Sequence, residues 1–361
     1  MRTPVAVLLS YRLGGADGVS VEARKWEWAL RSLGFETRRV AGELEDGGRR
    51  DDTPLPFLRI GADVSVSADF DALDAAIAGA DVVVVENLLS LPVNASAATG
   101  AAAVLARFPG RIVLHHHDLP WERPELTPAP GLPPPLPGAL HVTISDHARA
   151  TLAERGIEAV TIRNAFDPEP APGDRDGTRR RLGLGEDEQV VVQPTRAIPR
   201  KGIRAGLGLA AQLADANPSV STRYWLTGPD EDGYGPEVER ILAGATVPVT
   251  RGRTERVADV YAAADLVVMP SSWEGFGNPV AEAMLAERPV ACAPYPVLSE
   301  LLALGVEVLP IGDALAVASF VEHPDLEVLR RNHQIVGREL SLARLPGRLA
   351  QAFAQVGWDR W

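Results

Sequence analysis

Residues 264–294, "ADLVVMPSSWEGFGNPVAEAMLAERPVACAP", contain an apolar run, a glycine-containing turn, an amphipathic run and a second apolar run. The apolar runs are typical of buried strands, and the segment between them predicts a helix with Asn278 as N-cap and Pro279 at its first position. A strand, a crossover helix and a second strand form a parallel β-α-β unit. The stretch therefore predicts an α/β domain that binds ligands where its strands end.

The same alternation runs along the chain and indicates parallel sheets covered by helices. Residues 165–180 are rich in Pro, Gly and charge and predict a linker between two such series. We expect two facing, doubly wound Rossmann-like domains with a cleft between them, residues 1–166 and 167–344, and a C-terminal helix at about 345–361 that packs back onto the first domain. The predicted strands are 5–10, 81–87, 111–118, 141–145 and 159–164, then 189–196, 222–229, 264–271 and 288–294.

Composition narrows the classes of function. The formal net charge of −12 argues against a nucleic-acid partner and makes binding to an anionic membrane unfavourable. The apolar run near the start is too short for a signal peptide, so we expect a cytoplasmic protein. The single cysteine, Cys292, lies in an apolar segment and is predicted to be a core residue.

The helix predicted after Gly277 offers a phosphate site. Its first backbone N–H groups have no partner inside the helix, and the helix dipole favours an anion there. Glu274 and Glu282 flank this site, and because a carboxylate repels phosphate, both are expected to accept hydrogen bonds from sugar hydroxyls. The alternative is structural: Glu282 complements the helix dipole and Glu274 is solvated.

Lysine is rare in this chain. Of 36 basic residues only Lys25 and Lys201 are lysines, and Lys201 lies beside a glycine in "PTRAIPRKG", residues 194–202. A compact ammonium and the planar fork of Arg196 can divide the charge of a diphosphate. We therefore predict that Arg196 and Lys201 bind a diphosphate, whereas Lys25 lies on an amphipathic helix and suggests no site.

Three histidines, His115, His116 and His117, end a predicted strand. Successive strand residues point to opposite faces, so at most two could converge, and a zinc site is disfavoured. His117, beside Asp118, is expected to face the ligand, with His116 as the competing assignment. The next loop holds Trp121, Glu122 and Arg123, which suit a polyhydroxylated acceptor but fit surface packing equally well.

The segment "EGFGNPVAE", residues 274–282, resembles the Glu-x7-Glu signature of retaining glycosyltransferase family 4, which has the α/β fold called GT-B. The resemblance implies that Glu282 binds the ribose of a nucleotide-sugar, that Glu274, Phe276 and Gly277 contact the donor hexose, and that His117 hydrogen-bonds it. It also implies diphosphate contacts from Gly14, Gly15, Arg196, Lys201, Gly277 and Asn278. Further segments resemble the family in the same order: 12–36, 114–122, 143–168, 194–202 and 227–233.

This resemblance implies a hexosyltransferase that moves a sugar from a nucleotide-diphosphate donor to a hydroxyl with retention of configuration. His117, Asp118 and Glu274 are the predicted catalytic residues. No cofactor or metal is expected, because the acidic triplets at 174–176 and 230–232 are read as solvated and the leaving diphosphate is stabilised by protein groups. The acceptor is expected to be small, polar and soluble, while UDP, GDP and ADP sugars remain equal candidates as donors.

Other functions stay open. A nucleotide-sugar epimerase of the same fold would need acid and base carboxylates, for which Glu86, Asp118 and Glu122 are candidates. A membrane-lipid acceptor would use Trp26 and Trp28, which are better explained by burial against the sheet. A catalytically silent sugar-binding protein would not need both the basic pair, Arg196 and Lys201, and the acidic pair, Glu274 and Glu282. A dehydrogenase is disfavoured because residues 14–18, "GGADG", lack the Gly-x-Gly-x-x-Gly spacing.

The proline-rich residues 123–138 predict a stiff surface loop.

Overall fold

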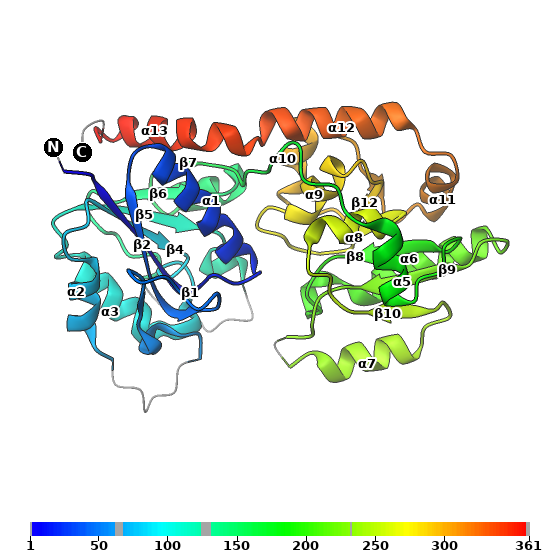
Figure 1. Cartoon of the computed structure of the whole chain (residues 1–361), viewed down its shortest axis with the longest axis horizontal. Coiled ribbons are helices and arrows are strands. Elements are labelled where there is room, and N and C mark those ends of the chain that lie inside the picture. Colours follow the sequence, from blue (N-terminus) through cyan, green and yellow to red (C-terminus); the bar gives the residue numbers. More distant parts are fainter. Residues whose placement is uncertain (1, 62–67, 124–130, 232, 359–361) are drawn as a thin grey trace. The chain divides into compact units, whose positions relative to one another are not determined.

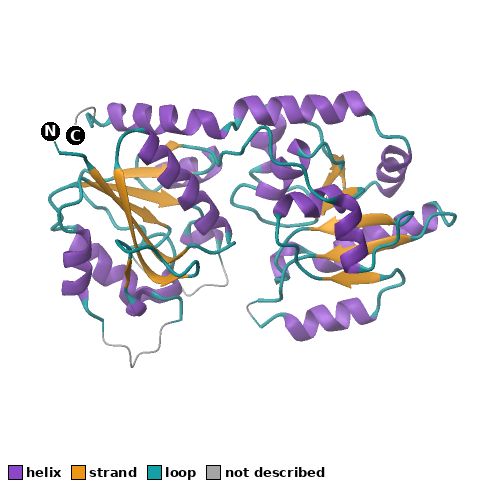
Figure 2. Ribbon diagram, in the orientation of Figure 1, coloured by secondary structure: helices purple, strands orange, loops and turns teal. Residues whose placement is uncertain are grey.

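The computed structural model describes residues 2–61, 68–123, 131–231 and 233–358. The chain forms two compact units, residues 1–165 together with 342–361, and residues 166–341. Within each unit a layer of parallel strands carries helices on both faces (Figure 1, Figure 2). Part of the proline-rich segment, residues 124–130, lies outside the described residues.

The sheet of the first unit has the strand order β3-β2-β1-β4-β5-β6-β7, and all its pairs are parallel. The order of the strands reverses between β1 and β4, so the carboxyl ends of these two strands flank the topological switch point where ligands bind to such sheets. The strands are β1 Val5–Leu13, β2 Glu36–Leu44, β3 Thr53–Pro54, β4 Val82–Glu86, β5 Arg111–His116, β6 Leu140–Thr143 and β7 Ala159–Thr161.

Two apolar clusters cover the two faces of this sheet. Helices α1 and α13 supply Trp26, Leu30 and Leu349 to one cluster, and α2 and α3 supply Leu73 and Ala101 to the other. The contact of α13 with α1 thus joins the end of the chain to the first unit. The helices are α1 Gly18–Ser32, α2 Phe70–Ile77, α3 Ala95–Leu105, α4 Asp146–Ala153 and α13 Leu345–Gln355, with 3-10 turns η1 Pro56–Leu58, η2 Pro92–Asn94, η3 Pro120–Glu122 and η5 Leu342–Arg344.

The tryptophans of α1 differ in environment. Trp26 is 2% exposed, as predicted, whereas Trp28 is 44% exposed and the prediction of its burial is wrong. Two residues that are two positions apart on a helix point about 200° away from each other, so only one of them can face the sheet.

The sheet of the second unit has the order β10-β9-β8-β11-β12-β13, again all parallel, with its switch point between β8 and β11. Cys292 is buried in β12, as predicted. The strands are β8 Gln189–Gln193, β9 Thr222–Leu226, β10 Val249–Arg251, β11 Leu266–Met269, β12 Val290–Cys292 and β13 Leu309–Pro310. The helices are α5 Arg175–Leu182, α6 Ile203–Ala216, α7 Gly235–Ala243, α8 Val257–Ala263, α9 Asn278–Leu285, α10 Leu298–Ala303, α11 Ala314–Glu322 and α12 Leu326–Glu339, with the 3-10 turn η4 Pro199–Lys201.

Two local predictions need correction, and four strands were not predicted. Helix α9 begins at Asn278, and its N-cap is Gly277, with a φ of 97°, rather than Asn278. The expected linker at 165–180 is partly helical, because Asp174 caps the start of α5 by accepting from the backbone N–H of Gly177. Strands β2, β3, β10 and β13 could not be predicted, because they lack long apolar runs; they lie beside or at the sheet edges.

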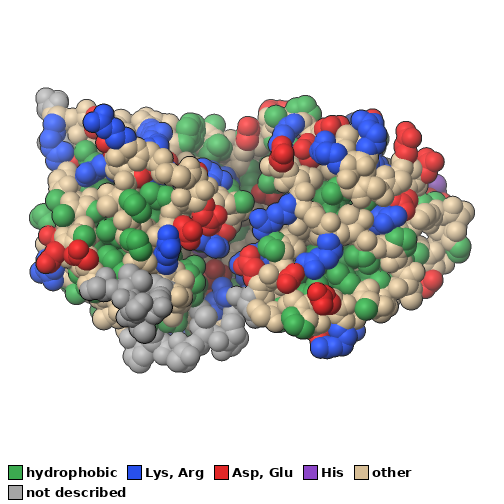
Figure 3. All heavy atoms as spheres, turned by 60° about the horizontal axis from the view of Figure 1, so that its bottom comes forward, with side chains coloured by type: hydrophobic (Ala, Val, Ile, Leu, Met, Phe, Trp, Pro, Cys, Tyr) green, Lys and Arg blue, Asp and Glu red, His purple; other side chains and the backbone are tan. Residues whose placement is uncertain are grey.

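The surface carries mixed charge. On the face in Figure 3, Lys and Arg side chains (blue) lie among Asp and Glu side chains (red) on each unit. Within the described ranges, every helix is too short or too polar to cross a bilayer. The expectations about nucleic acid and cellular location stay predictions.

Candidate functional site

The switch point of the second unit brings two loops together. Tyr224 donates to Gln193 Oε1 over 2.6 Å, and Gln193 Nε2 donates to the carbonyl of Lys201 over 2.8 Å, which anchors the loop after β8 to the sheet. Gly202 has a φ of 65°, and a Cβ there would lie 2.4 Å from the carbonyl oxygen of Pro270 in the loop after β11. Only glycine permits this close approach of the two loops.

Lys201 and Glu274 meet where these loops touch. Lys201 Nζ lies 2.5 and 2.6 Å from the two carboxylate oxygens of Glu274, and both side chains are buried. Burial alone would raise the pKa of Glu274, but Lys201 and Arg200 hold it below its usual value. Burial also lowers the pKa of Lys201, against the attraction of Glu274. The sequence assigned these residues to different ligand groups, and the structure places them in direct contact.

Helix α9 begins at Asn278, shortly after Glu274 in the chain. A Cβ on Gly277 would lie 2.2 Å from the hydroxyl of Tyr295, so glycine is required by both φ and space. The N-cap Gly277 has no side chain with which to cap this helix start, and an anion is favoured at a helix N-terminus by the helix dipole and the backbone N–H groups there. The Phe276 ring is buried, with its centroid 6.2 Å from that of Phe166, so its side chain belongs to the core.

Glu282 lies one turn into α9 and is half-buried. It accepts a hydrogen bond of 2.6 Å from the hydroxyl of Tyr261 on α8. Burial and the charge of Glu282 raise the pKa of Tyr261, so the phenol stays protonated and can hold the carboxylate in place. Tyr261 was not predicted from the sequence, because it lies in a helical segment with no recognisable motif next to it.

Arg196 lies in the loop after β8, but its Nη1 donates to Glu231 Oε2 over 2.7 Å. Asp230 pairs with Arg251 over 2.8 Å. Asp230 is exposed and Glu231 is partly exposed, which agrees with the reading of this acidic triplet as solvated, although both residues are ion-paired. Asp232 lies outside the described residues.

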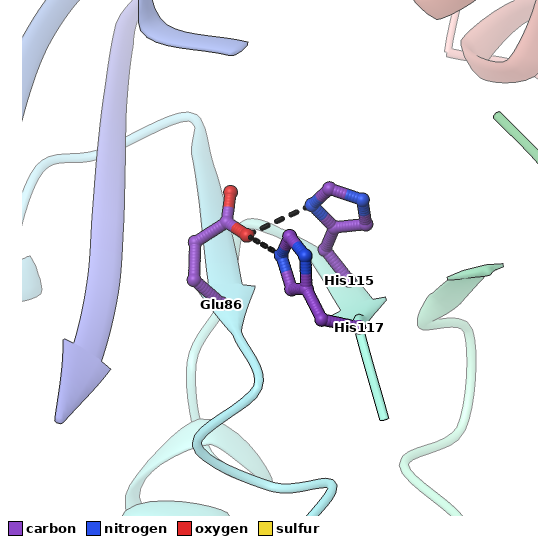
Figure 4. A group of neighbouring side chains, drawn as sticks. All are labelled: Glu86, His115 and His117. Atoms are coloured by element: carbon purple, nitrogen blue, oxygen red, sulfur yellow. Dashed lines mark hydrogen bonds and ion pairs between the residues drawn. The ribbon is translucent and has the colours of Figure 1, made fainter. Parts of the chain in front are cut away.

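In the first unit, Glu86 lies at the end of β4 beside His115 on β5. His115 Nδ1 and His117 Nε2 lie 2.8 and 2.7 Å from the same atom, Glu86 Oε2, and Figure 4 shows both imidazoles pointing at that oxygen. All three side chains are buried. The expectation that at most two histidines converge holds, and the sequence missed the carboxylate on which they do so. His117 was expected to contact a ligand; its Nε2 contacts Glu86, and its contact with a ligand stays a prediction.

His116 points to the other face of β5. Its Nδ1 lies 2.7 Å from Ser90 Oγ and its Nε2 lies 3.0 Å from His141 Nδ1. Burial lowers the pKa of His116 and brings that of His141 down to about 4, so both rings are neutral at pH 7. His116 thus belongs to a separate hydrogen-bond network from His117.

The loop after β5 packs onto the first unit. Trp121 Nε1 donates to Thr151 over 3.0 Å, and Arg155 lies 3.7 Å above the Trp121 ring. Glu122 Oε2 accepts from the backbone N–H of Leu119 over 2.8 Å, and burial raises the pKa of Glu122 to about 8. These contacts support the packing interpretation of Trp121 and Glu122.

The ion pair at the end of this loop is weak. Arg123 Nη1 lies 3.9 Å from Asp118 Oδ2, at the limit of an ion pair. Both side chains are partly buried.

The predicted glycine loop has a structural explanation as well. A Cβ on Gly14 would lie 2.5 Å from Asp46 Oδ1, and one on Gly15 would lie 2.5 Å from Glu45 Oε2. Asp17 accepts from the first backbone N–H groups of α1, so that helix start is already capped. These carboxylates weaken the case for a diphosphate at Gly14 and Gly15.

The buried ion pair of the second unit, Lys201 and Glu274, lies in the part of the chain that matches a known protein family. Residues 188–323 match the family model described as glycosyl transferases group 1. That region contains Lys201, Glu274, Gly277 and Glu282. The matched part thus contains the loops after β8 and β11, at the switch point of the second sheet.

Solved structures confirm the predicted fold, the two Rossmann-like domains of the GT-B class. HepE of Anabaena, solved with UDP and glucose, superposes with a TM-score of 0.71 at 19% identity and covers 97% of this chain and 100% of its own. Sucrose-phosphate synthase of Thermosynechococcus elongatus gives a TM-score of 0.72 at 19% identity, covering 98% and 99%.

Among curated proteins, mannosylglucosylglycerate synthase of Thermotoga maritima is 26% identical and covers 92% of this chain and 91% of its own. D-inositol 3-phosphate glycosyltransferase of Rhodococcus erythropolis is 35% identical over 51% of this chain and 40% of its own.

Proposed function

We propose that this protein is a retaining glycosyltransferase of family 4 that moves a hexosyl group from a nucleotide-diphosphate sugar to a hydroxyl of a small soluble acceptor. The observation that carries the proposal is the buried contact between Lys201 and Glu274 beside the start of α9, whose N-cap is Gly277. It lies at a sheet switch point, the place where open α/β sheets bind ligands, and inside the region that matches the glycosyltransferase model.

The donor diphosphate would be bound by cations and backbone donors. Lys201, Arg196 and the N–H groups at Gly277 and Asn278 are the candidates, with Gly14 and Gly15 as further contacts. At ~4 Å and an effective dielectric of ~20, one such cation contributes on the order of 4 kcal/mol before desolvation. In the structure the ammonium of Lys201 donates to Glu274, so a diphosphate would compete with that carboxylate for the ammonium.

The sugar and ribose would be bound by hydroxyl acceptors. Glu282, held by Tyr261, suits the two ribose hydroxyls, and Glu274 suits the hexose, since ionised carboxylates only accept hydrogen bonds. His117 and Asp118 in the first unit are the proposed contacts near the reacting carbon.

Transfer with retention would follow a front-face attack. The bond from the anomeric carbon to the diphosphate oxygen breaks, a bond to the acceptor oxygen forms on the same face, and the acceptor proton passes to the leaving phosphate oxygen. No protein nucleophile is needed. The charge on the leaving diphosphate would be stabilised by Lys201, Arg196 and the α9 N–H groups, so we propose that no metal is required.

The proposed class of acceptor is based on the names of two relatives and on the negative net charge of the chain. One relative is named mannosylglucosylglycerate synthase and another D-inositol 3-phosphate glycosyltransferase, and both names refer to small hydroxylated compounds. We therefore propose glycerate glycosides, inositol phosphates and similar polar compounds as the first acceptors to test, and a cytoplasmic location for the reaction.

A thermal-shift panel of UDP, GDP and ADP sugars tests donor binding. A ligand bound only by the native state stabilises it by about 2.7 kcal/mol at one hundred times its Kd, so one nucleotide class should raise Tm and the others should not. In Lys201→Met the rise should be lost. No shift with any nucleotide sugar, for a protein with a cooperative transition, would refute donor binding.

Two alternatives are separated by further assays. An epimerase would convert the nucleotide-sugar without any acceptor. A lipid acceptor would give co-sedimentation with anionic vesicles at physiological salt that is reduced by Trp28→Ala, since Trp28 is the exposed tryptophan of α1. We expect neither result.

A further inference from the structure

Glu86 is a fully buried carboxylate whose side chain contacts two imidazoles through one oxygen. His115 Nδ1 and His117 Nε2 lie within hydrogen-bond distance of Oε2, at 2.8 and 2.7 Å. Among the described residues, Oε1 has no hydrogen-bond partner. An ionised carboxylate only accepts hydrogen bonds, so both ring nitrogens must carry a proton that they donate to Oε2.

These three side chains are also close enough to share a metal ion. The distances argue against that role. Two ligands at about 2.0–2.1 Å from a tetrahedral zinc ion would lie roughly 3.3 Å apart. The observed 2.7 and 2.8 Å are shorter and match hydrogen bonds between ring N–H groups and a carboxylate.

The ionisation of Glu86 depends on both histidines. Burial alone would raise its pKa, but the two imidazoles bring the pKa of Glu86 down to about 2. His115 is itself fixed, because it is 0% exposed and its ring stacks on Trp26 with centroids 4.1 Å apart. His115 thus acts on His117 through the shared oxygen.

The orientation of His117 is fixed from two sides. Its backbone N–H donates to Asn87 Oδ1 over 3.0 Å, and its Nε2 contacts Glu86. Nδ1 has no hydrogen-bond partner among the described residues, and the side chain keeps 6% exposure where His115 has none. The nitrogen left for a ligand is therefore Nδ1.

We propose that Glu86, supported by His115, is a positioning residue that holds His117 as the Nε2–H tautomer and presents Nδ1 to a hydroxyl of the donor sugar. The second half of this statement rests on the proposed glycosyltransferase function, whereas the first half concerns the protein alone. In this role Glu86 positions a histidine, whereas the sequence made it a candidate only for the acid or base carboxylate of an epimerase.

Imidazole ¹⁵N-¹H correlation spectra test the tautomer directly. At a pH where the ring is neutral, wild-type His117 should show a proton on Nε2 and an unprotonated Nδ1. In Glu86→Gln the ring should become a mixture of tautomers, because an amide can donate as well as accept. Ser90→Ala is the matched control: it removes a buried partner of His116 at the same sheet edge and should leave the His117 signals unchanged.

Kinetics test the consequence. Glu86→Gln and His115→Phe should lower kcat at least tenfold and leave nucleoside diphosphate affinity within about twofold, because the cations proposed to bind the diphosphate, Arg196 and Lys201, belong to the second unit. A His117 ring with its proton on Nδ1 in the wild-type protein would overturn the proposal without any variant. So would one equivalent of tightly bound metal that is lost in Glu86→Gln. If the tautomer is as proposed but no sugar transfer occurs, the proposed function fails and the positioning role stands.

Discussion

Lys201 and Glu274 form a buried ion pair across two loops that follow different strands, with the ammonium 2.5 and 2.6 Å from the two carboxylate oxygens. Removing one partner of such a pair leaves an uncompensated buried charge, which costs about 3–5 kcal/mol. Lys201→Met and Glu274→Gln should each be strongly destabilising, and the double variant should cost far less than their sum. Urea denaturation gives the three values. Additive losses would show that the two residues do not interact.

The two glutamates should differ in nucleotide binding. Glu282→Ala should weaken both a nucleoside diphosphate and its sugar by about 1.5–3 kcal/mol, because a charged acceptor of ribose hydroxyls is lost. Glu274→Gln should not weaken the nucleoside diphosphate, because it frees Lys201 from its carboxylate, and should lower turnover. Calorimetry and initial rates measure both. Equal losses of nucleotide affinity in both variants would contradict this division.

Tyr261 offers a finer test of Glu282. Tyr261→Phe removes only the hydroxyl that donates to Glu282 and leaves the ring packed. Nucleotide affinity should fall by less than in Glu282→Ala, since the carboxylate remains but is less well oriented. An affinity loss larger than that of Glu282→Ala would mean that Tyr261 has a different role.

Gly277→Ala should destabilise the protein by about 1–3 kcal/mol, because the residue has a φ of 97° and its Cβ would meet the Tyr295 hydroxyl. Gly208→Ala in α6 is the matched control, since a Cβ there meets nothing within 4 Å. This substitution should raise the free energy of unfolding by about 0.5–1 kcal/mol. Chemical denaturation compares the two. Equal effects would show that the start of α9 tolerates a side chain.

Glu122 should make stability depend on pH. Its pKa is raised to about 8 by burial, so between the unfolded value near 4.3 and about 8 the folded state binds more protons than the unfolded state. The free energy of unfolding should therefore fall as pH rises through this window. Glu122→Gln stays neutral, so its stability relative to wild type should improve from pH 5 to pH 8. A difference that is constant with pH would mean that Glu122 ionises normally.

Much of the fold could be predicted because buried strands in parallel sheets read as short apolar runs, such as those at 81–87 and 189–196. The charged strand β2, Glu36–Leu44, was missed because Arg38 and Arg39 break that pattern. Its Arg39 is nevertheless buried, paired with Asp46 and Asp52. A long-range ion-pair network of this kind leaves no periodic signal in the sequence.

The candidate site was predicted residue by residue, but its contacts were not. The scarcity of lysine singled out Lys201, and the spacing singled out Glu274 and Glu282. Their partners could not be predicted, because Lys201 and Glu274 are 73 positions apart and meet only through strand order. In the same way, Glu86 meets His115 only because β4 and β5 pair in that register.

Product formation with chelated metal tests the central claim most directly. Purified protein with excess EDTA, the nucleotide-sugar identified by thermal shift and a panel of glycerate glycosides and inositol phosphates should yield a glycosylated acceptor, detected by mass spectrometry, with the anomeric configuration of the donor retained in its NMR spectrum. Lys201→Met should abolish this product. Product only after Mg²⁺ or Mn²⁺ is restored, inversion at the anomeric carbon, or conversion of the nucleotide-sugar with no acceptor present would each contradict the account.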